Sequence, residues 1–208
     1  MGNNKASFIG VNRHRLGIDG HGVVTLCAFA GCPLRCRYCL NDQCHDEKAS
    51  VLSLTPSELL DRVKVDNLYF LATGGGITFG GGEPLLNSRF IEEFCKICDP
   101  GWNITLETSL NVPLDHLERV YPYVNYYFID IKDMNSDIYV NYTRLSQKKL
   151  VSNLEWLMSK PDATEHVTVR LPHIPEYNTQ ADVDYSRKVL EEMGVKRFDE
   201  FDYIIRNK

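Results

Sequence analysis

Short runs of apolar, β-branched and aromatic residues recur along the chain, separated by polar or glycine-rich stretches. Runs of this composition and length are typical of β-strands. They predict six strands, which span residues 23–29, 76–79, 103–107, 126–131, 166–171 and 201–205.

Between these runs, apolar residues recur at the three- and four-residue spacing that is typical of helices. Thr55, Pro56 and Glu58 form the pattern of a capping box, and Thr179 can cap a helix that ends before Gly194. Two further predicted helices have apolar faces made of Phe90, Ile91, Phe94, Ile97 and Cys98, and of Leu150, Val151, Leu154, Leu157 and Met158.

The alternation of strands and helices predicts an α/β fold with a parallel sheet. About six such units are too few to close an eight-stranded barrel. We therefore expect a partial (β/α)6 barrel, an open parallel sheet with helices outside, in a single domain of residues 1–208. In such folds, the loops after the strands converge at the reactive site.

A chain of 208 residues that is 43% hydrophobic and 25% charged has the composition of a globular protein with a sizeable core. No run of about 18 apolar residues occurs, and the N-terminus lacks the apolar stretch of a signal peptide. We therefore expect a cytoplasmic protein with no membrane partner. The net charge of -5, without a block of Lys or Arg, argues against a nucleic-acid partner.

The chain has seven cysteines, and five of them lie between Cys27 and Cys44. An odd, clustered set is not the pattern of a disulfide framework, so metal binding is favoured. Cys32, Cys36 and Cys39 follow the first predicted strand as C-x3-C-x2-C. Thiolates at this spacing can surround one compact iron-sulfur centre. Because there are three of them, a 4Fe-4S cluster would keep one iron open to an outside ligand.

The alternative is a zinc site, with Cys27, Cys44 or His45 as the fourth ligand. Zinc sites usually use C-x2-C pairs, and no second pair follows at the spacing of a zinc ribbon or finger. Cys95 and Cys98 form C-x2-C on a predicted helix, where core cysteines are favoured over a second metal site. Cys27 is also expected in the core, whereas Cys44 and His45 could be surface residues.

The cysteine loop resembles the signature of the radical S-adenosylmethionine (SAM) superfamily, C-x3-C-x-aromatic-C, with Tyr38 as the aromatic residue. The resemblance implies that Cys32, Cys36 and Cys39 bind a 4Fe-4S cluster whose open iron binds the amine and carboxylate of SAM. It also implies that the backbone around Tyr38 contacts the adenine. The implied chemistry is reductive cleavage of SAM to methionine and a 5'-deoxyadenosyl radical, which abstracts hydrogen from a substrate.

Polar residues also follow the later predicted strands. The stretch Gly81-Gly82-Glu83 resembles the motif with which the superfamily holds the amino group of SAM. Asp130 and Lys132 point the same way on a strand, and they form either a structural ion pair or contacts to the ribose and carboxylate of SAM. Arg170, near the end of the fifth strand, either pairs with an acidic neighbour or contacts SAM.

Within the superfamily, nearly the whole chain resembles the glycyl radical enzyme activases, the family of pyruvate formate-lyase activating enzyme. The matching stretches are Asp19-Gly20-His21-Gly22, Tyr38-Cys39-Leu40-Asn41, Glu107-Thr108, Asp130-Ile131-Lys132, and Val169-Arg170 with Pro175-Glu176-Tyr177-Asn178. The resemblance makes Asn41 a candidate SAM contact, and it makes Glu107, Thr108 and Asp130 candidates for a monovalent cation beside SAM. His21 replaces a proline of that family, and Glu176 replaces a glycine.

The activase resemblance implies two protein partners: a flavodoxin or ferredoxin-type electron donor, and a glycyl radical enzyme that receives the radical. One alternative is a radical SAM enzyme that modifies a peptide or small molecule directly. Another is a zinc-stabilised binding module without catalysis. No residue outside the SAM motifs names the substrate.

Overall fold

A computed structural model of the chain describes residues 4–46 and 52–205. The chain divides into two compact units. The first unit comprises Met1–Cys32, Asn41–Thr108 and Leu114–Tyr127, and the second comprises Pro33–Leu40, Ser109–Pro113 and Phe128–Lys208. This division does not test the predicted single domain of residues 1–208, which stays a prediction.

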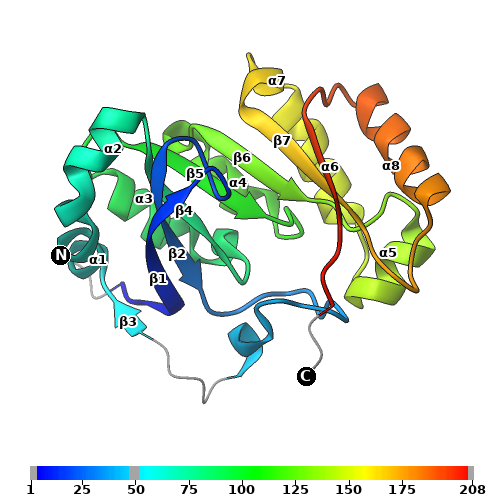
Figure 1. The fold of residues 1–208 in the computed structure, drawn as a ribbon, viewed down its shortest axis with the longest axis horizontal. Coiled ribbons are helices and arrows are strands. Elements are labelled where there is room, and N and C mark those ends of the chain that lie inside the picture. Colours follow the sequence, from blue (N-terminus) through cyan, green and yellow to red (C-terminus); the bar gives the residue numbers. More distant parts are fainter. Residues whose placement is uncertain (1–3, 47–51, 206–208) are drawn as a thin grey trace. The chain divides into compact units, whose positions relative to one another are not determined.

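The first unit is built on β1 (Ala6–Leu16), β2 (Val23–Phe29), β3 (Leu52–Leu54), β4 (Gly76–Gly81) and β5 (Asn103–Thr108). These strands hydrogen-bond in the order β3-β1-β2-β4-β5 (Figure 1). The strands β2, β4 and β5 run parallel, whereas β1 is antiparallel to both β2 and β3. Because β2, β4 and β5 are parallel, their carboxyl ends lie at the same edge of this sheet.

An aromatic cluster fills the core of the first unit. Phe29 stacks on Phe8 with 4.5 Å between the ring centroids and on Phe79 with 5.6 Å. Phe90 contacts Phe8 and Phe29 edge to face. Such aromatic pairs contribute stability beyond the area that they bury. The cluster therefore fixes the end of β2, from which the cysteine loop departs.

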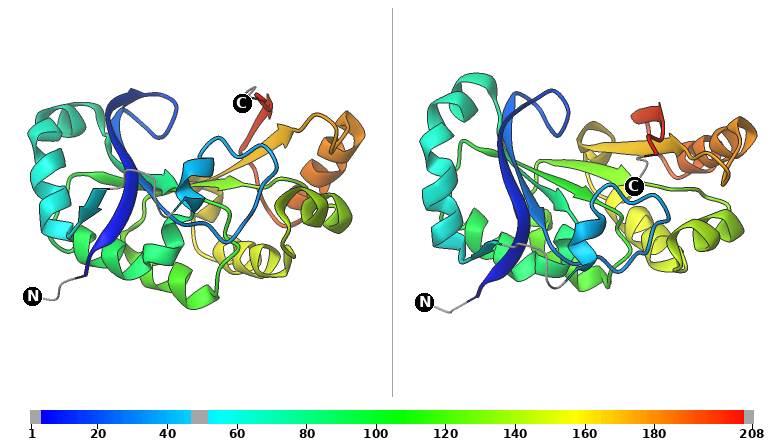
Figure 2. Two further views of the ribbon diagram at one scale, coloured as in Figure 1. Left: turned by 90° about the horizontal axis from the view of Figure 1, so that it is seen from below. Right: turned by 60° about the horizontal axis from the view of Figure 1, so that its bottom comes forward.

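The helices of the first unit are α1 (Pro56–Val63), α2 (Asn67–Thr73), α3 (Ser88–Cys95) and α4 (Leu114–Val120). The predicted capping box begins α1, since Glu58 N donates to Thr55 Oγ1 at 3.2 Å and Thr55 N donates to Glu58 Oε2 at 2.7 Å. Both views of Figure 2 show α1 and α2, in cyan and turquoise, beside the dark blue β1–β2 hairpin. Arg13 of β1 donates hydrogen bonds of 2.6 and 2.5 Å to Asp66, the residue just before α2. These bonds hold the hairpin against the start of α2.

The second unit contains most of β6 (Tyr126–Asp130), together with β7 (Val167–His173) and β8 (Phe198–Asp202), which are neighbours in that order. The strands β7 and β8 run parallel. The helices of this unit are α5 (Ser136–Thr143), α6 (Lys148–Met158), α7 (Ala163–His166) and α8 (Gln180–Glu192). As predicted, Thr179 caps α8, and the helix ends before Gly194.

The predicted α/β fold with an open sheet is confirmed. At the two ends of the strand order, β3 pairs with β1 and β8 pairs with β7, and neither has a second partner strand among the described residues. Short 3₁₀ helices complete the described elements: η1 (Asp42–His45), η2 (Lys64–Asp66), η3 (Pro84–Asn87) and η4 (Tyr121–Tyr123). None of the described helices is long and apolar enough to cross a membrane.

Three details of the sequence prediction are wrong. The antiparallel strands β1 and β3 are missing from it, because the second half of β1 is rich in charged residues and β3 has only three residues. The last strand covers Phe198–Asp202 instead of residues 201–205, because its three acidic residues hide it from a search for apolar runs. Ile97 and Cys98 lie beyond the end of α3, and Ile97 is 46% exposed.

Candidate functional site

The cysteine loop begins at the carboxyl end of β2, where its first residue is hydrogen-bonded to the stretch that follows β4. Gly31 N donates to Cys44 O at 2.9 Å, and Glu83 N donates to Gly31 O at 2.8 Å. Cys32 follows directly and is half-buried. Within the first unit, the start of the cysteine loop and the Gly-Gly-Glu stretch therefore meet at the carboxyl ends of neighbouring strands, as predicted.

Gly81 and Gly82 allow a backbone approach that side chains would prevent. A Cβ on Gly82 would lie 2.1 Å from Gly31 O, and a Cβ on Gly81, where φ is +92°, would lie 2.7 Å from Ala28 Cα. Only glycine fits both positions without a shift of the backbone. Asn41 Nδ2 donates to Gly81 O at 3.0 Å. The structure thus brings together three of the predicted site residues.

Glu83 is a buried carboxylate, 1% exposed, at the start of η3. Its Oε1 accepts a hydrogen bond from Thr108 Oγ1 at 2.6 Å and another from Leu85 N at 3.1 Å. These donors compensate for the burial of the carboxylate and fix its orientation. A buried, oriented carboxylate is suited to an ammonium group of a ligand.

Two more acidic residues of the predicted motifs lie in the first unit. Glu107 of β5 is half-buried, and a Cβ on Gly80 would lie 2.9 Å from its Oε2, so the glycine makes room for the carboxylate. Asp19 is 5% exposed and forms an ion pair with Arg15. The carbonyl of Asp19 also accepts a hydrogen bond from Thr78 Oγ1 at 2.6 Å, which fixes the stretch of residues 19–22 to β4.

In the second unit, the end of α5 holds the backbone of the Cys36–Cys39 turn. Arg35 N donates to Thr143 O at 2.8 Å, and Arg37 N donates to Tyr142 O at 3.1 Å. Within the turn, the amide of the second cysteine donates to the carbonyl of the first at 3.3 Å. Both cysteines are half-buried, so their thiols lie on one tight turn with partial access to solvent.

Lys132 places a positive charge close to these two thiols. Burial alone would lower the pKa of Lys132, but the charges of Asp130 and Cys36 outweigh it, and the net pKa lies above the ordinary value. Burial raises the pKa of Cys36 to about 11, and Lys132 opposes that rise. A neighbouring cation favours the thiolate, which is the form that binds iron.

The structure contains the ion pair that the sequence offered as one interpretation of Asp130 and Lys132. Lys132 Nζ lies 3.5 Å from Asp130 Oδ2. Arg170 has the acidic neighbour that the sequence offered as one interpretation, since its guanidinium lies 3.7 Å from Asp199 Oδ2. The guanidinium also lies 4.6 Å from the ring centroid of Phe128. The alternative, that these residues contact SAM, stays a prediction.

The remaining cysteines differ in burial. Cys27 is completely buried, so its expected place in the core is confirmed, whereas the suggestion that Cys44 is a surface residue is wrong because it is only 6% exposed. Cys95 and Cys98 are half-buried near the end of α3, and burial raises the pKa of both thiols.

In residues 4–46 and 52–205, no three His, Cys, Asp or Glu side chains are gathered closely enough to hold a single metal ion.

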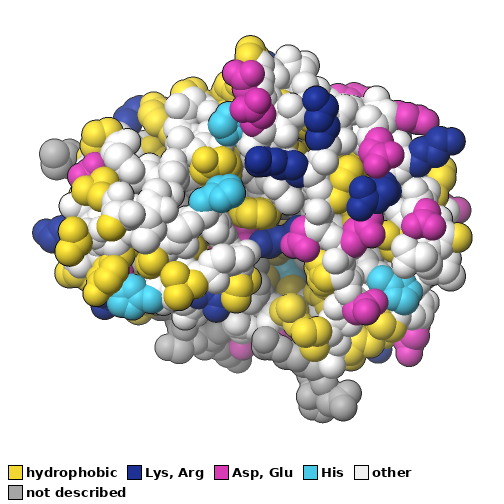
Figure 3. Space-filling view, turned by 45° about the horizontal axis from the view of Figure 1, so that its top comes forward, with side chains coloured by type: hydrophobic (Ala, Val, Ile, Leu, Met, Phe, Trp, Pro, Cys, Tyr) yellow, Lys and Arg dark blue, Asp and Glu magenta, His cyan; other side chains and the backbone are white. Residues whose placement is uncertain are grey.

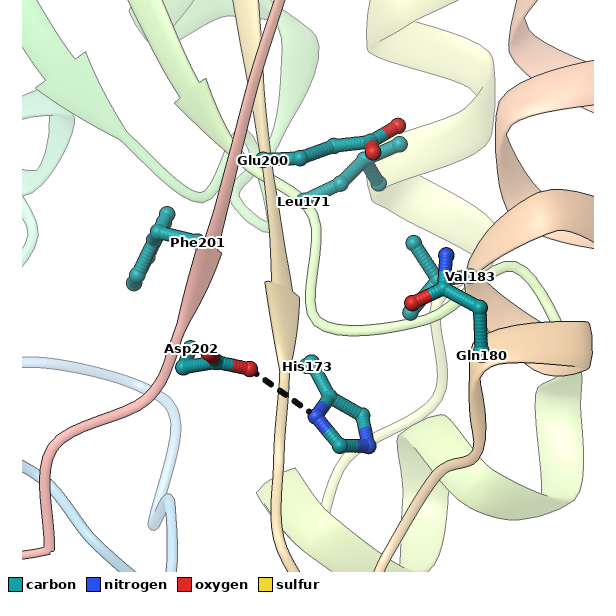
Figure 4. Close-up of a pocket in the computed structure, with 7 residues that line it drawn as sticks. All are labelled: Leu171, His173, Gln180, Val183, Glu200, Phe201 and Asp202. Carbon is teal, nitrogen blue, oxygen red and sulfur yellow. Dashed lines mark hydrogen bonds and ion pairs between the residues drawn. The ribbon is translucent and has the colours of Figure 1, made fainter.

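A pocket of about 190 Å³ lies in the second unit, between α8 and the pair of strands β7 and β8. Figure 4 shows His173 and Asp202 pointing toward one another on its wall, with 3.1 Å between Nδ1 and Oδ1. Figure 3 shows basic and acidic side chains interspersed over the right-hand part of the surface in that view. Arg187 of α8 and Glu200 of β8 form an ion pair. No predicted cofactor residue lines this pocket, so it is separate from the candidate site.

Two side chains that the sequence did not single out as site residues contact Tyr38. Tyr203 Oη donates to Tyr38 O at 2.8 Å, and Tyr38 Oη donates to Glu176 Oε2 at 2.7 Å. No motif covers Tyr203, and the resemblance marks Glu176 only as a departure from glycine. The two partners of Tyr38 lie 138 and 165 positions away from it in the sequence. Contacts over such separations leave no local signal in the sequence.

A comparison with protein families now decides the assignment, because residues 27–184 match the profile of the Radical SAM superfamily. The chain belongs to this superfamily. The superfamily uses a 4Fe-4S cluster and SAM, and these are the cofactors of this radical SAM protein.

The relatives of the chain include two activating enzymes. Over 150 residues the chain is 33% identical to the (2S)-3-sulfopropanediol dehydratase activating enzyme of Klebsiella oxytoca, an alignment that covers 69% of this chain and 45% of that protein. Over 172 residues it is 29% identical to the pyruvate formate-lyase-activating enzyme of Staphylococcus aureus (strain USA300), with 79% and 67% covered. The chain thus spans about half the length of the first of these relatives.

A solved structure supports the fold. The crystal structure of Streptococcus suis SuiB bound to precursor peptide SuiA superposes with a TM-score of 0.64 at 13% sequence identity. The superposition covers 89% of this chain and 41% of SuiB. At this identity the likeness concerns the fold alone.

The residues of the chain fit both cofactors. The thiol donors are soft ligands suited to iron, and those at Cys36 and Cys39 lie beside the half-buried cation of Lys132. The glycines at positions 81 and 82 leave a cradle that side chains would fill, next to the buried carboxylate of Glu83. Such a cradle suits the close approach of a small ligand with an amino group.

Proposed function

We propose that this protein is an activating enzyme that uses SAM to place a glycyl radical on a partner enzyme. The observation that carries the proposal is that the two curated relatives described above are both activating enzymes and align over 69% and 79% of this chain. The buried Glu83 at the end of β4 supports it, because an activase must hold SAM in one orientation for a single hydrogen abstraction.

The proposed cluster ligands are Cys32, Cys36 and Cys39. Four residues of chain span at most about 14 Å, so Cys32 and Cys36 stay within reach of one cluster whatever the path between them. The bound cluster and SAM supply the electron transfer and the radical. Lys132 contributes by favouring thiolates at Cys36 and Cys39.

In the first unit, we assign the SAM amino group to Glu83, with Thr108 as the residue that orients its carboxylate. The carbonyl of Gly81 and the side chain of Asn41 fix the turn around that carboxylate. The glycines keep this surface free of side chains, so that a nucleoside can approach the backbone.

In the second unit, we assign the backbone around Tyr38 to the adenine and the side chains of Asp130 and Lys132 to the ribose and carboxylate of SAM, with Arg170 as a further SAM contact. Asp130 would then orient Lys132 through the ion pair between them. A monovalent cation beside SAM, with Glu107, Thr108 and Asp130 as its ligands, is part of the same proposal.

The partners that follow from this function are a glycyl radical enzyme and a flavodoxin or ferredoxin-type electron donor. The candidate glycyl radical enzymes are pyruvate formate-lyase and (2S)-3-sulfopropanediol dehydratase, because the relatives described above are named for them. A cytoplasmic location and the lack of nucleic-acid and membrane partners belong to the proposal as well.

The experiment follows the transfer of deuterium from glycine to the 5'-deoxyadenosyl group of SAM. Each candidate enzyme is prepared with deuterated glycine and incubated without oxygen with the reconstituted protein, SAM and a reductant. The proposal predicts deuterium in the 5'-deoxyadenosine and a glycyl radical signal in the electron paramagnetic resonance (EPR) spectrum of one partner. A Glu83→Gln variant should greatly reduce both signals.

Two results would contradict the activase proposal. One is 5'-deoxyadenosine that carries no deuterium with any glycyl radical enzyme but takes up hydrogen from a peptide or small molecule. The other is a protein that never forms 5'-deoxyadenosine.

A further inference from the structure

Glu176 sits on a turn that is rigidly built. Ile174 N donates to Asn178 Oδ1 at 2.6 Å, and Asn178 Nδ2 donates at 3.1 Å to both Pro172 O and Asp133 Oδ2. Asn178 and Asp133 are 6% and 1% exposed, so the hydrogen bonds that close the turn are shielded from water. The turn therefore presents Glu176 at a defined place in the second unit.

The backbone of Glu176 is strained. Its φ is +70°, in the left-handed region, where a residue with a side chain costs about 1 kcal/mol more than glycine. A glycine at this position would remove that cost. The side chain of Glu176 therefore costs free energy at this position unless its contacts compensate for the strain.

The contact of Glu176 is the aromatic residue of the cysteine motif. Tyr38 Oη donates to Glu176 Oε2 at 2.7 Å. The ring of Tyr177 meets the ring of Tyr38 edge to face, with 5.8 Å between centroids and an interplanar angle of 87°. The same rigid turn thus supplies both a hydrogen-bond acceptor and a packing partner to Tyr38.

The backbone of Tyr38 is held separately. Tyr203 Oη donates to its carbonyl at 2.8 Å, and Arg37 N, one residue before, donates to Tyr142 O. With the backbone fixed on both sides, the remaining freedom of Tyr38 is the direction of its side chain. The bond to Glu176 restricts that direction.

We propose that Glu176 is a positioning residue that holds Tyr38 and, through it, the Cys36–Cys39 turn, in the geometry that receives the cluster and the adenine of SAM. The inference rests on the proposed SAM site. It adds that the second unit shapes this turn before any cofactor binds. Preorganisation of this kind lowers the cost of binding.

The test compares four variants with the unaltered protein. Glu176→Gly removes the acceptor and suits the backbone, Glu176→Gln keeps an oxygen acceptor, and Tyr38→Phe removes the donor. Asp162→Gly is the matched control, since Asp162 of the second unit is also acidic and also has a positive φ, +59°. Cluster-free protein is alkylated with iodoacetamide, and the rates at Cys36 and Cys39 are measured by mass spectrometry. Reconstituted protein then gives KM and kcat for SAM cleavage.

We expect Glu176→Gly and Tyr38→Phe to raise both alkylation rates and the KM for SAM about threefold to tenfold, with kcat changed less than twofold. Glu176→Gln and Asp162→Gly should match the unaltered protein. The inference is overturned if Glu176→Gly alkylates at the unaltered rate, or if Glu176→Gln is as impaired as Glu176→Gly. If the unaltered protein cleaves no SAM, the proposed function fails, while the alkylation rates still decide whether Glu176 holds the turn.

Discussion

Thr108 and Glu83, 25 residues apart in the sequence, are joined by a 2.6 Å hydrogen bond from the threonine hydroxyl to the glutamate Oε1. Both residues are almost completely buried, Thr108 at the end of β5 and Glu83 after the end of β4. The bond orients one carboxylate at the edge where the parallel strands β4 and β5 end. If this carboxylate binds the amino group of SAM, then Thr108 sets its direction.

Replacing Thr108 with valine tests this relationship. Valine keeps the shape of threonine but cannot donate, so Glu83 loses one of its two donors described above. We expect SAM to bind about tenfold more weakly, because hydrogen bonds to charged groups contribute about 1.5 to 3 kcal/mol. Equilibrium dialysis with the reconstituted protein measures this affinity. Thr105→Val, on the same strand, is the control and should bind SAM as the unaltered protein does; equal weakening in both variants would argue against a specific role for Thr108.

The close approach at Gly82 gives a second prediction. A Cβ in Gly82→Ala would lie 2.1 Å from Gly31 O, so the hydrogen bond from Glu83 N to that carbonyl cannot keep its geometry. We expect the melting temperature to fall by several degrees, roughly 5 °C or more, and iron uptake to decrease.

Gly17→Ala is the matched control for this variant. Gly17 has a positive φ of +66°, which Gly82 does not have, and no atom lies within 4 Å of its added Cβ. The substitution at Gly17 therefore adds backbone strain without a clash, and a clash at Gly82 should cost more. A Gly82→Ala protein as stable as Gly17→Ala would show that the approach of the two loops is not tight.

The pairing of Asp66 with Arg13 gives a prediction about pH. The hydrogen bond from Arg13 holds the pKa of Asp66 below its ordinary value of 3.8. A carboxyl group with a lowered pKa adds stability above its ordinary pKa, and this contribution is lost as the pH falls through the lowered pKa. The Asp66→Asn variant should therefore melt about 4 °C lower than the unaltered protein at pH 7.

The difference in melting temperature between the two proteins should shrink steadily as the pH falls below 3.8, the ordinary pKa of the group. Circular dichroism of cluster-free protein measures it across this range. Asp61→Asn is the control, because Asp61 pairs with Lys64 on the exposed surface, where an ion pair adds little. A difference between Asp66→Asn and the unaltered protein that stays constant with pH would rule out the proposed linkage.

Local signals account for the parts of the structure that the sequence predicted. The capping box of Thr55 and Glu58 and the parallel strands β2, β4 and β5 are each specified by residues close together in the chain. The short glycine-rich stretch at the end of β4 is likewise readable, because few residues other than glycine can take its backbone conformation.

The contacts around Tyr38 could not be predicted in this way. The hydroxyl of Tyr203 reaches the backbone of Tyr38 across 165 residues, and no pattern around Tyr203 marks it for that role. The strand β8 is hidden for a related reason, since three of its five residues are acidic and its place depends on pairing with β7. Partners that are set by tertiary packing leave no trace in local periodicity.

The central claim is that three cysteines of one loop hold a cluster with an open iron that binds SAM. The direct measurement is the EPR spectrum of the anaerobically reconstituted, reduced protein with and without SAM, together with its iron content. We predict about four irons per chain, a spectrum that changes when SAM is added, and loss of both in Cys32→Ala, Cys36→Ala and Cys39→Ala but not in Cys98→Ala. A protein that holds one tetrahedral zinc, or a cluster whose spectrum is the same with and without SAM, would contradict the account.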